Sequence, residues 1–113
     1  MKKARPFLKT LTGGSKFKRL LGDGQKLKDL RAGLVVLKPG ESVGGHSTEG
    51  KEEVLIILKG TAGVYLGGRK VSAKEHSFIY IPPQMHHNVE NTGRNLLKYV
   101  YITSSCQNSL IEI

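Results

Sequence analysis

Glycine and proline divide this chain into short segments, and no stretch after residue 27 has a helical period. Runs of apolar and β-branched residues of strand length each end at glycine, proline or asparagine. The longest apolar run is Val54 to Leu58, and Gly67-Gly68 is a hairpin signal. Short strands at this spacing are typical of an all-β sandwich or barrel. We expect strands at 34–37, 53–58, 63–66, 69–72, 77–81, 86–91 and 96–103.

Positive charge is concentrated in the N-terminal quarter of the chain. Residues 1–31 carry ten basic and two acidic residues, whereas residues 32–113 carry eight and seven. We therefore expect a basic N-terminal arm or strand segment at 1–31 and a barrel domain at 32–113, which is all that 113 residues accommodate. Such an arm can contact phosphates, but it shows no nucleic-acid reading element, so a solvated basic surface is the favoured interpretation.

Three further features narrow the class of protein. No apolar run approaches the roughly 20 residues of a membrane span, and the N-terminus lacks a secretory pattern. The single cysteine, Cys106, excludes an internal disulfide framework. We expect a cytoplasmic protein without a membrane partner. Both faces of the 54–58 strand are apolar, so the second face needs a cover, and we expect a homodimer.

Strand alternation directs one carboxylate into the apolar interior. Glu53 shares its face with Leu55 and Ile57, because alternate residues of a strand point the same way. A carboxylate buried in this way costs several kcal/mol unless it is paired or bound to a cation. A lysine or a buried tyrosine hydroxyl is one such partner, and a divalent metal ion is another.

The histidines divide by the same alternation. His87 shares a face with Val89 and is expected inside, while His86 points to solvent. His46 follows two glycines, so it is either a metal ligand or a loop residue at the mouth of the barrel. Imidazole and carboxylate together suit Fe(II), Mn, Ni, Zn or Cu. The alternative is that the histidines are ordinary core or rim residues.

Two spaced motifs resemble those of the cupin family, over residues 32–103. The first motif is a glycine, five residues, His-x-His, a glutamate, six residues and a glycine. The second motif runs from a proline to a histidine and then to an asparagine. The resemblance implies a double-stranded β-helix, also called a jelly-roll barrel. The matching residues are Gly40, His46, Glu53 and Gly60 in the first motif and Pro82, His87 and Asn91 in the second.

This sequence departs from the cupin pattern at three positions. Thr48 stands where the motif has its second histidine, and His76 and Gln84 stand at glycine positions. A neutral hydroxyl is a poor ligand for a divalent metal, so the resemblance leaves two imidazoles and one carboxylate. The implied ligands of an Fe, Mn, Ni or Zn ion are His46, Glu53 and His87. Thr48 is expected to contact a bound water or substrate oxygen, and Tyr80 to line the pocket.

The resemblance implies a small metal-binding cupin that binds or transforms a small polar organic molecule. Dioxygenase, decarboxylase and isomerase chemistry all occur in the family, so the fold does not select a reaction. The alternative is a metal-free cupin that binds or senses a ligand without catalysis.

Overall fold

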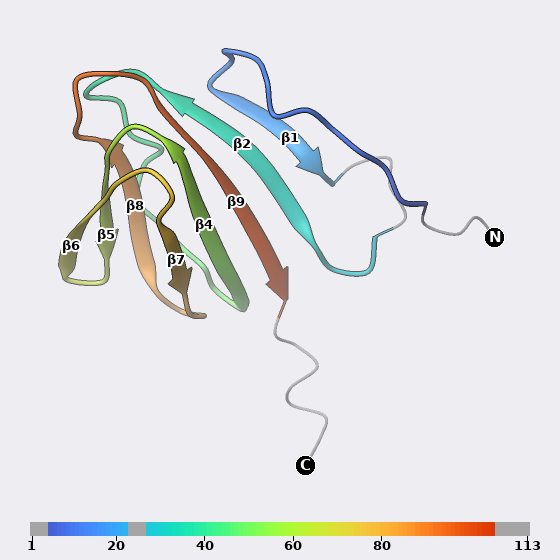
Figure 1. The fold of residues 1–113 in the computed structure, drawn as a ribbon. Coiled ribbons are helices and arrows are strands. Elements are labelled where there is room, and N and C mark those ends of the chain that lie inside the picture. Colours follow the sequence, from blue (N-terminus) through green and yellow to red (C-terminus); the bar gives the residue numbers. More distant parts are fainter. Residues whose placement is uncertain (1–4, 23–26, 106–113) are drawn as a thin grey trace.

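The computed structural model describes residues 5–22 and 27–105, which fold into two antiparallel sheets (Figure 1). One sheet has the strand order β1-β2-β9-β4-β7 and the other has the order β3-β8-β5-β6. No helix long and apolar enough to cross a membrane occurs among these residues. Cys106 lies outside them. The strands are β1 Phe17–Leu21, β2 Arg31–Leu37, β3 His46–Ser47, β4 Lys51–Lys59, β5 Ala62–Leu66, β6 Arg69–Ala73, β7 Phe78–Ile81, β8 His86–Asn91 and β9 Leu97–Ser105.

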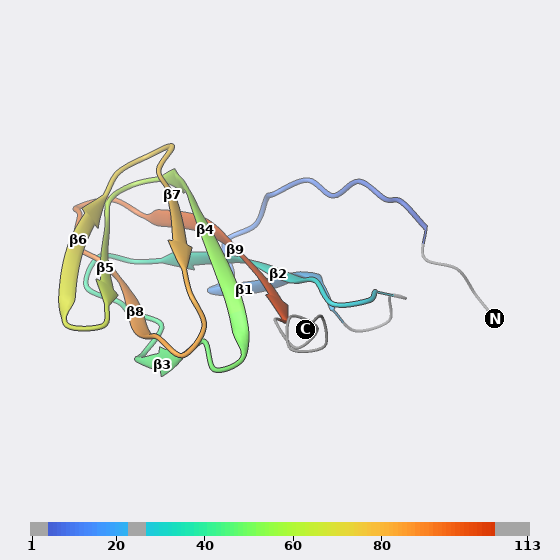
Figure 2. The same cartoon turned by 90° about the horizontal axis from the view of Figure 1, so that it is seen from below.

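The core lies between the two sheets, which face each other in Figure 2. Along β4, Leu55 and Ile57 are buried while their neighbours are half-buried, so the predicted alternation is confirmed. Val64 and Val89 meet them from the smaller sheet. Burial of each such side chain contributes about 1.5–3 kcal/mol. The all-β jelly-roll architecture expected from the sequence is confirmed.

The N-terminal segment packs against the outer face of the larger sheet. Strand β1 pairs antiparallel with β2, and Leu11 contacts a second apolar cluster that includes Leu20 and Leu34. Lys9 Nζ donates a hydrogen bond to the Leu20 carbonyl at 2.7 Å. The basic segment therefore supplies one strand and a stretch that covers part of the sheet.

Two departures from the cupin pattern lie in turns of left-handed backbone. His76 has a φ of 70° and Gln84 a φ of 60°. This conformation costs an L-residue roughly 1–2 kcal/mol, and glycine adopts it freely. The turns keep the geometry that a glycine favours even though the chain places larger residues there.

Candidate metal site

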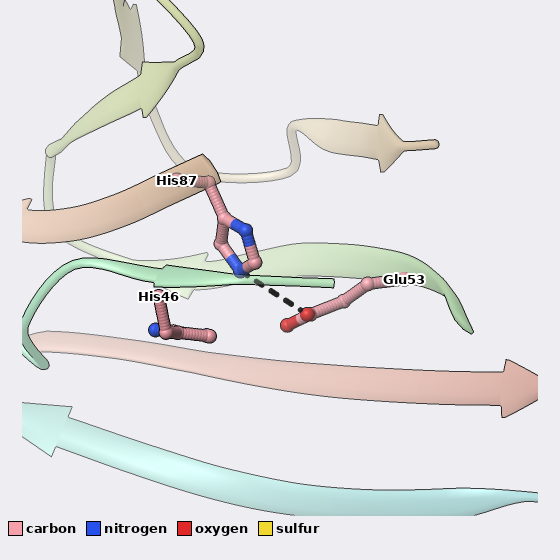
Figure 3. A group of neighbouring side chains, drawn as sticks. All are labelled: His46, Glu53 and His87. Carbon is pink, nitrogen blue, oxygen red and sulfur yellow. Dashed lines mark ion pairs between the residues drawn. The ribbon is translucent and has the colours of Figure 1, made fainter. Parts of the chain in front are cut away.

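Three strands bring His46, Glu53 and His87 together (Figure 3). His46 on β3 is the register partner of His87 on β8, and Glu53 comes from β4 in the opposite sheet. One potential ligand atom from each side chain lies within 4.8 Å of the other two. The group therefore joins the two sheets at one edge of the interior, and its atoms could hold a metal ion.

The two imidazole rings meet edge to face, with centroids 4.1 Å apart and planes inclined by 64°. His46 Nδ1 lies 3.0 Å from the Gly44 carbonyl oxygen, and His87 Nδ1 lies 3.2 Å from that of Met85. A carbonyl oxygen only accepts, so each Nδ1 donates its proton. In each neutral ring the lone pair then belongs to Nε2, which is the arrangement that histidine ligands of metals use.

His87 Nε2 is buried and makes no hydrogen bond, although Glu53 Oε1 lies only 3.2 Å away. The contact is close enough for an ion pair, but an N–H at this position does not point at the oxygen. Buried polar atoms are rarely left without a partner, and an unsatisfied one calls for an explanation. The lone pair of His87 Nε2 and the Glu53 carboxylate converge on one point. A divalent metal ion can bind both groups there, so the residues fit such an ion.

The electrostatics of His87 follow from the same neighbours. Burial lowers the pKa of His87, but the contact with Glu53 and the Met85 carbonyl outweigh it, and the net pKa lies above the usual value. The Glu53 carboxylate therefore stabilises positive charge at Nε2. A proton and a metal ion compete for this atom.

Thr48 is buried and connects two turns. Its hydroxyl donates to the Pro82 carbonyl at 2.7 Å and accepts the Met85 N–H at 3.0 Å. These bonds hold the segment that follows His46 against the turn that precedes His87. The contact of Thr48 with a bound water or substrate oxygen stays a prediction, and the structure shows that the hydroxyl proton is donated to the Pro82 carbonyl.

Tyr80 lies on the other side of the sheet from the three ligand candidates. Its register partner on β4 is Val54, so it faces outward, and its hydroxyl donates to the Glu52 carboxylate. Alternation assigns the inward position of β7 to its neighbour Ile81, which is fully buried. Tyr80 therefore does not line the pocket expected of it.

A pocket of about 480 Å³ opens beside His46 and Glu53. Tyr99 and Tyr101, from adjacent β9, form part of its wall. Burial raises the pKa of Tyr99, and the charge of Glu53 raises it further, so this hydroxyl stays protonated. The sequence did not indicate Arg19, Arg31 and Lys51, which also line the pocket.

Comparison with known proteins identifies the family. Residues 33–103 match the model of the Cupin domain. The chain belongs to the cupin family. This cupin resembles a Thermotoga maritima structure described as a predicted oxalate decarboxylase, with a TM-score of 0.74 and 28% identity over 79% of this chain and 78% of that one.

Two relatives of this cupin share about a third of the aligned residues. It is 33% identical over 66 residues to the oxalate-binding protein of Thermotoga maritima, covering 58% of this chain and 54% of that protein. It is 34% identical over 70 residues to the mannose-1-phosphate guanylyltransferase RfbM of Salmonella typhimurium, covering 62% of this chain and 15% of that enzyme. The chain thus spans little more than half of one relative and a small part of the other.

Proposed function

We propose that this cupin binds a divalent Fe, Mn, Ni or Zn ion through His46, Glu53 and His87, and that the ion helps to bind a small carboxylate anion. The observation that carries the proposal is the buried Nε2 of His87, which has no hydrogen bond and faces Glu53. A bound metal ion supplies positive charge for an anionic oxygen. The chain's own residues orient the two imidazoles through the Gly44 and Met85 carbonyls.

The carboxylate class of ligand has two supports. One is the 33% identity to an oxalate-binding protein. The other is the pocket beside His46 and Glu53, whose lining includes three cationic side chains. The tyrosines Tyr99 and Tyr101 offer hydroxyl groups to the same space. The proposal concerns binding and assigns no reaction.

Metal reconstitution followed by a binding measurement tests the proposal. The protein is incubated separately with Fe(II), Mn(II), Ni(II) and Zn(II) under reducing conditions, desalted and analysed for metal. We expect about one ion per chain for at least one metal, because three ligands converge on one point. Calorimetry with oxalate should then show binding to the loaded protein and none to the metal-free protein. Absence of uptake for all four metals would favour the metal-free cupin instead.

We also propose that this cupin is a homodimer through the outer face of β4 and β7. Phe78 is 67% exposed and Tyr80 is 50% exposed on this face, next to the half-buried Val54 and Ile56. Contiguous exposed apolar residues are typical of an interaction surface. They support an interface that both copies share through a two-fold axis.

The oligomer is measured by light scattering coupled to size exclusion. We expect a mass of twice 12.4 kDa for the wild type, and a shift toward the monomer for Phe78→Ser. The matched control is Phe7→Ser, which removes an equally large and 50% exposed ring from the N-terminal segment. A monomeric wild type would contradict the proposed dimer.

A further inference from the structure

The pocket continues well beyond the three candidate ligands, along the inner face of the larger sheet. In the strand register, Glu53 on β4 pairs with Thr103 on β9, and Thr103 pairs with Arg31 on β2. Paired residues of neighbouring strands share a face, so these three side chains form one row on the pocket wall. Neighbouring strands lie about 4.8 Å apart, which puts the backbone of Arg31 about 10 Å from that of Glu53.

The next row on the same face brings a second arginine. Arg19 on β1 pairs with Gly33 on β2, which pairs with Tyr101 on β9. The Tyr101 ring lies directly over Gly33, since a Cβ added there would be 2.4 Å from a ring carbon. The glycine thus lets the tyrosine extend across β2 toward β1. Arg19 and Arg31 accordingly mark the part of the pocket farthest from β4.

The charge of the pocket wall favours a ligand with more than one negative group. Three cationic residues, Arg19, Arg31 and Lys51, line the pocket together with two acidic ones, Glu49 and Glu53. A divalent ion at Glu53 makes the balance still more positive. Arg31 donates one of its five N–H groups to the Leu30 carbonyl at 2.8 Å. Its planar guanidinium is suited to a carboxylate.

We propose that the ligand is a dicarboxylate longer than oxalate, an inference that rests on the proposed function. One carboxylate of the ligand binds the metal ion that His46, Glu53 and His87 hold. The other carboxylate binds Arg31 and Arg19. The hydrocarbon between them lies along the rings of Tyr99 and Tyr101. Oxalate cannot reach both ends, because its two carboxylates are joined directly, whereas β9 lies between Glu53 on β4 and Arg31 on β2.

The experiment compares a length series on the metal-loaded protein. Metal content is measured first, and calorimetry then gives the affinities for oxalate, succinate, glutarate and adipate. We expect a member longer than oxalate to bind most tightly. Arg31→Gln should weaken the affinity for that ligand about tenfold, which corresponds to about 1.4 kcal/mol. The same variant should change the affinity for oxalate by less than about twofold. The control is Arg69→Gln, which removes an exposed arginine from β6 in the other sheet.

Two results would overturn the inference while leaving the proposed function standing. One is a metal-loaded protein that binds oxalate at least as tightly as every longer member. The other is a normal affinity of Arg31→Gln for the preferred member, confirmed with the double variant Arg19→Gln/Arg31→Gln. A protein that takes up no metal contradicts the proposed function itself, and the metal assay identifies that case before any ligand is added.

Discussion

Replacing His87 with alanine weakens metal binding by roughly 100-fold or more. Changes to residues that only orient a metal ligand already cost about 10- to 100-fold in affinity, and His87→Ala removes one of three ligands. The lost imidazole is also the one whose Nε2 lies 3.2 Å from Glu53 Oε1. Only His46 and Glu53 then remain to hold the ion. The measurement is a competitive titration of the reconstituted metal against a chelator of known affinity.

The neighbouring His86 provides the matched control. It follows the same turn on β8 but is exposed, on the face opposite to His87. His86→Ala should bind metal as the wild type does. Glu53→Gln is a second test that preserves side-chain volume and removes the charge, and it should also weaken binding strongly. Equal metal affinities for wild type, His87→Ala and Glu53→Gln would contradict the assigned ligands.

Strand alternation accounts for how much of the site the sequence could predict. A period of two residues fixes which side chains of a strand share a face, so the inward direction of Glu53 and His87 followed from Leu55 and Val89. His46 was harder, because β3 has only two residues and no pattern of its own. Its placement depends on pairing with β8, which is a long-range contact.

The pocket residues that the sequence did not predict are also brought together by pairing between strands. Nothing local to Arg19 or Arg31 indicates a pocket. Only the pairing of β1 with β2 and of β2 with β9 brings Arg19 into the row of Tyr101, and only the pairing of β2 with β9 brings Arg31 into the row of Glu53. A basic segment by itself is typical of a solvated surface. The outward direction of Tyr80 could have been inferred from its buried neighbour Ile81.

Replacing Gly60 with alanine destabilises the fold by about 2–5 kcal/mol. Gly60 has a φ of 88°, which costs an L-residue roughly 1–2 kcal/mol. A Cβ there would lie 2.5 Å from the Leu96 carbonyl oxygen and 3.0 Å from the Leu97 Cα. Both are backbone atoms, so relief requires the β8–β9 connection to move, and overpacking of this kind costs about 1–3 kcal/mol more. This close approach and the positive φ are physical reasons for a glycine at position 60 of this chain.

Thermal unfolding measures the effect of Gly60→Ala against Gly68→Ala. At Gly68 the φ is not in the left-handed region and an added Cβ meets nothing within 4 Å, so that variant should change stability by less than about 0.5 kcal/mol. For a domain of this size the loss at Gly60 corresponds to a decrease in Tm of roughly 10–25 °C. Equal Tm values for the two variants would show that the turn between β4 and β5 relaxes without strain. In that case the contact with the start of β9 would not explain the glycine at position 60, because neither its positive φ nor its short distance to Leu96 would cost stability.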